Sequence, residues 1–256
     1  MRAQQGMLTI AGLGPGAPEW ITPEAAAALA DATDIIGYGP YVARLALRPD
    51  QSAHASDNRV EIERARHALQ LAQDGAHVAV VSGGDPGVFA MAAAVFEAME
   101  HGPAAWRALD VRVLPGVSAM QAAAARVGAP LGHDFCAISL SDNLKSWEVI
   151  ARRLKAAAEG DFVIALYNPA SRARPQTIHD AFALLRGRKA GATPVVFAQS
   201  VGRSDERMHI TTLAAADVSL ADMRTLVIIG SSETRLVARA QGAPFVYTPR
   251  SYGAGR

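Results

Sequence analysis

Short apolar runs alternate with helically spaced segments along the first half of the chain. Residues 7–11 (MLTIA), 77–81 (HVAVV) and 111–114 (VRVL) are rich in aliphatic and β-branched side chains, which predicts buried strands. The segment 61–74 places small apolar residues three and four positions apart, which predicts an amphipathic helix, and the alanine-rich run at 25–32 predicts another helix. This regular alternation of strand and helix favours a parallel sheet covered by helices.

Capping residues mark where two of these helices begin. Thr22 is followed by Pro23 and Glu24, the order expected for an N-cap, a first-turn proline and an acidic residue near the positive end of the helix. Asn58 and Glu61 have the spacing of a capping box, so they predict the start of the second helix.

The spacing of the apolar runs changes after Gly128, where strands become more frequent than helices. The second half therefore predicts a mixed sheet. We expect two α/β domains, residues 1–117 and 118–256. The second domain is expected to contain strands at 135–140, 162–167, 194–199, 209–213 and 226–230, and helices at 146–158 and 176–185.

Composition limits the class of protein. The 256 residues are 50% hydrophobic and 19% charged, with a net charge of +1, so a sizeable core is expected and a nucleic-acid partner is not. No apolar run approaches a membrane span, and the single cysteine, Cys136, permits no disulfide within the chain. The histidines show no metal-ligand spacing, so we expect no metal. A cytoplasmic protein without membrane contact fits these features.

The loop SGGDPGVF, residues 82–89, follows one predicted strand and precedes a helix. In open α/β sheets, ligands bind at the carboxyl ends of the strands, and glycines let a ligand approach the backbone closely. Asp85 places a carboxylate there, and Pro86 with Gly87 fixes the turn. A tight strand-to-helix turn with a capping aspartate is the structural alternative.

A dinucleotide-binding enzyme is a further alternative, because GLGPGA at 12–17 satisfies G-x-G-x-x-A after a strand. Two details disfavour it. Pro15 lacks the N–H that a pyrophosphate needs, and the second predicted strand ends in GYGP at 37–40 without an acidic residue for a ribose. The strand ends instead indicate a nucleoside-type cofactor.

Five loop motifs occur together in one order: GLGPG (12–16), SGGDPGVF (82–89), PGVSA (115–119), LSD (140–142) and YNP (167–169). In this order and spacing they resemble the tetrapyrrole methylases over nearly the whole chain. The resemblance implies a two-domain α/β methyltransferase that binds S-adenosylmethionine in the cleft between its domains. It also implies a homodimer.

Longer runs at 35–42, 61–75, 84–98, 128–142 and 164–175 resemble one branch of that family. This branch methylates C17 of precorrin-3B and contracts the ring to precorrin-4 in cobalamin biosynthesis. The cobalt-precorrin counterpart of the anaerobic route stays an alternative, as does a methylase of the same fold that acts on RNA or protein. A non-enzymatic binding module is disfavoured by the many glycine-lined strand ends.

The resemblance implies that the cofactor contacts come from the loops after the strands. These residues are Pro15, Gly83, Gly84, Asp85, Val88, Ser118, Ala119, Asn168 and Val201.

The implied ring contraction requires proton movement, for which we expect Asp142 and His133 as acid–base residues. Asp142 could instead cap the helix at 146–158, and His133 could be an ordinary loop residue. The substrate carries several carboxylates, which suit guanidinium groups, so Arg172, Arg174 and Arg203 are predicted to bind it. Arg172 and Arg174 precede a predicted helix, where basic charge opposes the helix dipole, and this favours anion binding.

Overall fold

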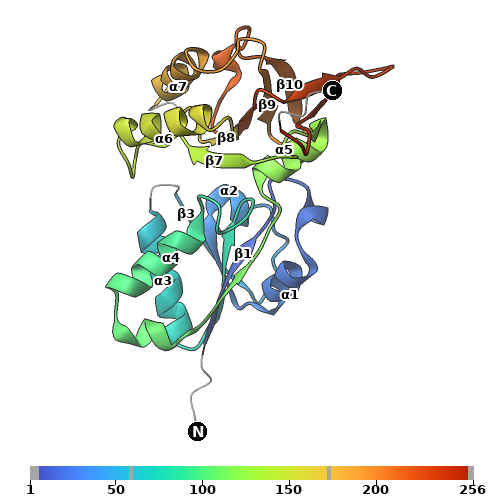
Figure 1. Ribbon diagram of the computed structural model, residues 1–256. Helices are drawn as coiled ribbons and strands as arrows, with labels where there is room; N and C mark the ends of the chain where they lie inside the picture. Colours follow the sequence, from blue (N-terminus) through green and yellow to red (C-terminus); the bar gives the residue numbers. More distant parts are fainter. Residues whose placement is uncertain (1–5, 58–59, 172–173, 253–256) are drawn as a thin grey trace. The chain divides into compact units, whose positions relative to one another are not determined.

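The computed structural model describes residues 6–57, 60–171 and 174–252. The chain divides into two compact units, Met1–Ala119 and Met120–Arg256. Each unit combines a five-stranded sheet with helices, as Figure 1 shows.

The first unit is built on a wholly parallel sheet with strand order β3-β2-β4-β1-β5. The prediction of a mostly parallel sheet is confirmed. Its strands are β1 (Met7–Gly12), β2 (Asp34–Tyr38), β3 (Ser52–Ser56), β4 (His77–Ser82) and β5 (Asp110–Leu114). Its helical segments are η1 (Pro18–Trp20), α1 (Pro23–Asp31), α2 (Gly39–Val42), α3 (Glu61–Gln73), α4 (Met91–His101) and η2 (Ala104–Ala108).

Helices cover both faces of this sheet. In Figure 1, α3 and α4 lie on one side of β1 and α1 lies on the other. The predicted apolar stripe of α3 is buried and packs with Ile10 and Val80 of the central strands. Because both faces are covered, the central strands are apolar without alternation. This continuous apolar character is why they could be predicted from the sequence.

Three local features of this unit test the predictions made from its sequence. Thr22 caps α1 as predicted, because its Oγ1 accepts a hydrogen bond from the N–H of Ala25 at 3.1 Å. The α3 helix begins at Glu61 after Val60, whose side chain makes no cap bond; Asn58 lies outside the described residues. The polar edge strand β3 and the four-residue helix α2 have no apolar periodicity, and the sequence did not predict them.

The second unit contains a mixed sheet with strand order β10-β9-β11-β8-β7. Only β7 and β8 are parallel, and the other neighbours are antiparallel, so the predicted mixed sheet is confirmed. The strands are β7 (Phe135–Ser139), β8 (Val163–Tyr167), β9 (Pro194–Gln199), β10 (Arg207–Thr212) and β11 (Thr225–Ile229). The helical segments are α5 (Ala119–Val127), α6 (Trp147–Glu159), α7 (Gln176–Arg186) and η3 (Val218–Leu220).

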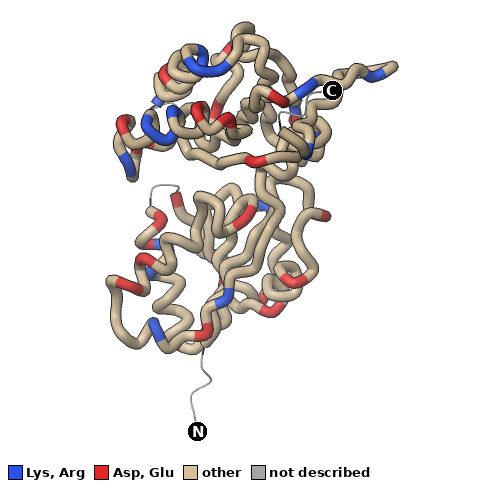
Figure 2. Tube along the Cα trace, viewed as in Figure 1, with Lys and Arg blue, Asp and Glu red and all other residues tan. Residues whose placement is uncertain are grey.

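The core of this unit lies where α6 and α7 cover the sheet. Leu154 of α6 and Phe182 of α7 are fully buried with Leu166 of β8 in one cluster. The charged residues of α6, which are of both signs as Figure 2 shows, are exposed. The helices expected at 146–158 and 176–185 are therefore present, and each buries one apolar face.

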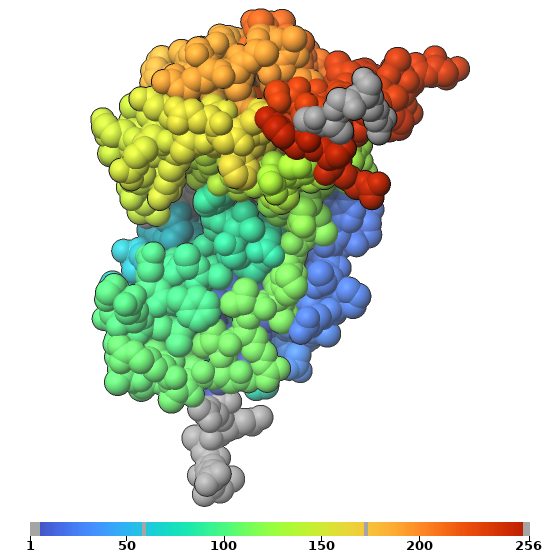
Figure 3. Space-filling model, viewed as in Figure 1, coloured from blue at the N-terminus to red at the C-terminus, as the bar shows by residue number. Residues whose placement is uncertain are grey.

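A second, small sheet joins β6 (Gly128–Ala129), β12 (Arg235–Val237) and β13 (Phe245–Tyr247). These strands have two or three residues each, too few for any periodicity, and the sequence did not predict them. The orange-red segment that contains β12 and β13 extends away from the rest of this unit in Figures 1 and 3. Among the residues that the structure describes, every helix is too short or too polar to cross a membrane.

The buried side chain of Lys189 and the carboxylate of Asp161 join three connecting segments of the second unit, which lie before β8, before β9 and after β11. The Nζ of Lys189, whose side chain is only 3% exposed, lies 3.1 Å from Oδ1 of Asp161. Asp161 also accepts a hydrogen bond from the backbone N–H of Ser232 at 2.9 Å. Burial alone would raise the pKa of Asp161, but the hydrogen bonds from Ser232 and Lys189 together hold this pKa below its ordinary value.

Replacing Lys189 by methionine is expected to lower the free energy of unfolding by about 1–3 kcal/mol, because a half-buried carboxylate loses its charged partner. The pKa of Asp161 is lowered on folding, so its ion pair stabilises the fold above the unfolded value of about 3.9 and is lost as the pH falls through the folded value. The difference in free energy of unfolding between wild type and Lys189→Met should therefore be largest above pH 5 and become smaller in acid.

Denaturant unfolding at several pH values measures this difference. Arg188→Met is the matched control, because the neighbouring Arg188 is exposed and its guanidinium donates to the carbonyl of Leu184. Equal losses for the two variants, or a gap that does not depend on pH, would contradict the account.

Candidate functional site

Three loops meet at the carboxyl edge of the first sheet: the first loop (residues 12–17), the second loop (83–90) and the third loop (115–118). The first and second loops form an antiparallel bridge between Gly14 and Gly84. The N–H of Gly84 donates to the carbonyl of Gly14 at 3.0 Å, and the return bond measures 3.2 Å. The first and second loops are therefore joined through their backbones.

Glycine is required where these backbones touch. A Cβ added to Gly12 would lie 2.7 Å from the carbonyl oxygen of Gly84, and one added to Gly116 would lie 2.4 Å from the same oxygen. Gly84 itself has a φ of +72°, a region that other residues rarely adopt. The sequence analysis assigned the glycines of the second loop to close approach by a ligand; the structure shows that Gly12 and Gly116, in the other two loops, permit close approach between the loops themselves.

Asp85 joins the second loop to the third. Its Oδ1 accepts a hydrogen bond from the N–H of Gly87 at 2.8 Å, and its Oδ2 accepts one from the N–H of Gly116 at 3.0 Å. The structural alternative considered for this residue, a carboxylate that fixes a turn, is therefore present in the structure. A carboxylate with four acceptor positions retains capacity for a ligand beside these two bonds.

Arg44, which follows α2, was not identified from the sequence. Its guanidinium donates to the carbonyl oxygens of Leu13, Gly14 and Gly16, at 2.9, 3.1 and 3.0 Å. No motif surrounds Arg44, and it lies 28 to 31 residues from the loop that it contacts. Only the fold reveals this contact.

The remaining predicted cofactor residues of the first unit lie on the same loops. Ser118 is 2% exposed and, with Ala119, lies just under 4 Å from the Cβ position of Gly84. The N–H of Val88 donates to the carbonyl of Asp85 at 3.3 Å. Pro15 is partly buried within the first loop. The structure therefore gathers the predicted residues of this unit at one edge of the sheet.

Asn168 and Val201 follow β8 and β9 in the second unit. Asn168 has a φ of +50°, and its Nδ2 donates to Oγ of Ser139 at 3.0 Å. Val201 is 5% exposed and follows Ser200, whose φ is +51°. Two non-glycine residues with left-handed backbones mark these strand ends as conformationally constrained.

The structure places Asp142 beside Arg174. The Nε of Arg174 lies 3.4 Å from Oδ1 of Asp142, and only 13% of the Arg174 side chain is exposed. The alternative that Asp142 caps α6 is wrong, because Ser146 is the N-cap residue and no side chain bonds the helix end. Arg172 lies outside the described residues.

His133 lies before β7 and Arg203 lies after β9. The Nδ1 of His133 accepts a hydrogen bond from the N–H of Asp134 at 2.7 Å, and its ring centroid lies 6.1 Å from that of Tyr252. Arg203 is exposed, and its N–H donates to the carbonyl of Ser200 at 3.0 Å. Among the described residues, the structure joins the predicted base Asp142 to the predicted substrate residue Arg174.

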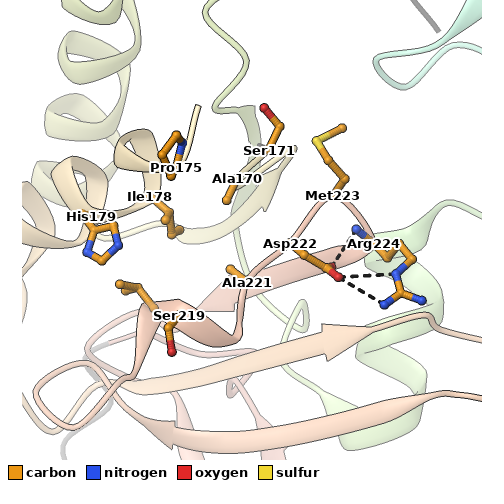
Figure 4. Close-up of a pocket in the computed structure, with 11 residues that line it drawn as sticks. Ala170, Ser171, Pro175, Ile178, His179, Ser219, Ala221, Asp222, Met223 and Arg224 are labelled. Carbon is orange, nitrogen blue, oxygen red and sulfur yellow. Dashed lines mark hydrogen bonds and ion pairs between the residues drawn. The ribbon is translucent and has the colours of Figure 1, made fainter. Parts of the chain in front are cut away.

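A cavity of about 510 Å³ opens beside α7 and η3 in the second unit. Figure 4 shows Ile178, Ala221 and other small or apolar side chains around it, with Asp222 hydrogen-bonded to Arg224. No described residue predicted for the site lines this cavity. In the parts of the chain that the structure describes, no three His, Cys, Asp or Glu side chains are grouped to hold a metal ion.

Known proteins resemble this chain over its length. The family model for tetrapyrrole (corrin/porphyrin) methylases matches residues 7–217. A precorrin-3B C(17)-methyltransferase from Sinorhizobium sp is 58% identical over 96% of this chain and 97% of its own length. A probable cobalt-factor III C(17)-methyltransferase from Salmonella typhimurium is 42% identical over 96% of this chain and 99% of its own length. The crystal structure of the methyltransferase CobJ superposes with a TM-score of 0.90 at 50% identity, covering 95% of this chain and all of that one.

The chain therefore belongs to the tetrapyrrole methylases, and the family resemblance read from its loop motifs is confirmed. Its similarity to precorrin-3B C17-methyltransferases is confirmed as well, by a relative that matches almost end to end. Membership of this family rules out the two alternative hypotheses, a dinucleotide-binding enzyme and a non-enzymatic binding module.

Replacing Gly116 by alanine is expected to lower the free energy of unfolding by about 1–3 kcal/mol, since backbone atoms that cannot move aside occupy the Cβ position. Gly39→Ala is the matched control, because nothing lies within 4 Å of a Cβ at Gly39. Chemical denaturation measures both changes. A Gly116→Ala protein as stable as Gly39→Ala would show that the loops do not need this contact.

Proposed function

We propose that this protein transfers a methyl group from S-adenosylmethionine to C17 of precorrin-3B and contracts the ring to give precorrin-4 in cobalamin biosynthesis. The single observation that carries this proposal is the 58% identity to a precorrin-3B C(17)-methyltransferase over 96% of the chain. The cobalt-containing substrate is the second candidate, supported by the weaker 42% identity to a cobalt-factor III relative.

In this proposal the three loops of the first unit hold S-adenosylmethionine through Gly83, Gly84, Asp85, Val88, Ser118 and Ala119, with Pro15 beside them. Asn168 and Val201 are the proposed contacts from the second unit. Loops made of glycine and small residues offer backbone groups and little positive charge. That composition suits an adenosyl group with a sulfonium better than a polyphosphate.

The methyl transfer needs C17 of the macrocycle in line with the methyl group, so the main contribution of the protein is orientation. Arg174 is proposed to bind a substrate carboxylate, because guanidinium groups pair with carboxylates in a fixed geometry. Arg172 and Arg203 are proposed for the same role. The ring contraction moves a bridging carbon into an acetyl group and requires a base for a hydroxyl proton. We assign this base to Asp142, with His133 as the second candidate.

The proposal also places the enzyme in the cytoplasm as a homodimer, with a tetrapyrrole as its small-molecule partner and no nucleic acid or membrane partner. The single cysteine supports the cytoplasmic location, and the balanced charge supports the absence of a nucleic-acid partner. The homodimer rests on the resemblance to the family.

The function is tested by incubating the protein with methyl-labelled S-adenosylmethionine and either precorrin-3B or cobalt-factor III. The proposal expects the label in precorrin-4, detected by mass and visible spectrum, with slower or no conversion of the cobalt compound. Faster conversion of the cobalt compound would select the second candidate. Label that enters RNA or protein and never a tetrapyrrole would overturn both.

The Asp142→Asn variant is expected to lower kcat by about 10²-fold or more while leaving the affinity for S-adenosylmethionine unchanged, because the base is lost and the cofactor loops are intact. Asp110→Asn serves as the control, since this half-exposed carboxylate lies at the amino end of β5 and not in a predicted site loop. Stopped-flow spectra of the macrocycle give both rates. A kcat within threefold of wild type for Asp142→Asn would exclude Asp142 as the base.

A further inference from the structure

The first loop has little stability of its own. Gly12, Gly14 and Gly16 leave its backbone with unusual conformational freedom, and Pro15 removes one N–H that could otherwise anchor it. Gly14 has a φ of +63°. A loop of this composition needs contacts from elsewhere in the fold to keep one conformation.

Arg44 supplies such contacts. Its three hydrogen bonds all end on carbonyl oxygens of the first loop, at Leu13, Gly14 and Gly16, on both sides of Pro15. A guanidinium is planar and presents its donors in a fixed fork, so three simultaneous bonds specify the directions of three peptide groups. Hydrogen bonds from a charged donor are also stronger than neutral ones.

The contact extends to the second loop. The carbonyl oxygen of Gly14 accepts from Arg44 and also from the N–H of Gly84. The ring of Tyr41, one turn before Arg44, occupies the space beside Gly83, because a Cβ there would lie 2.7 to 2.9 Å from ring atoms and the hydroxyl. Residues 41–44 therefore contact both loops.

The segment that carries Arg44 is itself anchored. Val42 of α2 is 7% exposed and packs with Leu13 and Val81 in the sheet core. The ring of Tyr41 packs edge-to-face on that of Tyr38, with centroids 5.4 Å apart. Because these contacts fix the position of residues 41–44, they also fix the position of the loops that Arg44 and Tyr41 contact.

We propose that Arg44 is a positioning residue for the cofactor: it holds the first loop, and through Gly14 the second, in the conformation that binds S-adenosylmethionine. This inference rests on the proposed function, because it assigns the loops to the cofactor. Arg44 acts through the backbone of the loops and takes no part in the methyl transfer itself.

The test compares Arg44→Met with Arg186→Met. Arg186 is the matched control because its guanidinium also donates to backbone carbonyls, those of Leu213 and Ala216 at 3.0 and 2.8 Å, at the end of α7 in the second unit. Each variant is assayed for the KM of S-adenosylmethionine, for kcat and for melting temperature. Arg44→Lys, which keeps the charge but loses the fork, is the conservative variant.

We expect Arg44→Met to raise the KM for S-adenosylmethionine about tenfold, the scale of a lost set of charged hydrogen bonds, with kcat within about twofold. Arg44→Lys should fall between wild type and Arg44→Met, and Arg186→Met should leave the KM unchanged. A KM for Arg44→Met within twofold of wild type, or an equal rise for Arg186→Met, would overturn the proposal.

Amide hydrogen exchange without cofactor separates this inference from the proposed function. Arg44→Met, or Arg44→Lys should the former not fold, is expected to exchange faster at Leu13 and Gly14 than wild type, with β8 unchanged. Unchanged exchange at these amides would overturn the positioning role even if wild type binds S-adenosylmethionine. Faster exchange in a protein that fails to bind this cofactor would instead refute the proposed function.

Discussion

The first unit depends on direct backbone contact between the loops that follow three neighbouring strands. Gly12, Gly84 and Gly116 approach so closely that a single Cβ at Gly12 or Gly116 would overlap backbone atoms of the neighbouring loops. Parallel pairing of β1 with β4 and β5 brings these loops to the same edge, and the glycines let them touch. A surface with few side chains results, and a flat adenosyl group can approach such a surface closely.

Such an edge needs stabilisation that glycines cannot give, and two charged residues provide it. Asp85 accepts backbone hydrogen bonds within the second loop and from the third, while Arg44 donates to the carbonyls of the first. The carboxylate of Asp85 accepts hydrogen bonds from N–H groups, and the guanidinium of Arg44 donates hydrogen bonds to carbonyl oxygens. Because both charges act on backbone groups, they hold the edge in one shape through its peptide groups.

The sequence predicted the parts that depend on local pattern. Buried strands such as β4 and amphipathic helices such as α7 carry periodic apolar residues, and Thr22 caps α1 as its position implied. The strands of the small sheet, β6, β12 and β13, are too short to show a period. The contact of Arg44 with the first loop joins residues about 30 positions apart, so it appears only in the folded chain.

Amide hydrogen exchange with and without S-adenosylhomocysteine, the product left when the cofactor gives up its methyl group, tests the central claim most directly. If the glycine edge holds the cofactor, the ligand should slow exchange across residues 12–17, 83–90 and 115–118 and leave α3 unaffected. Protection confined to other segments, or no protection at saturating ligand, would contradict the account.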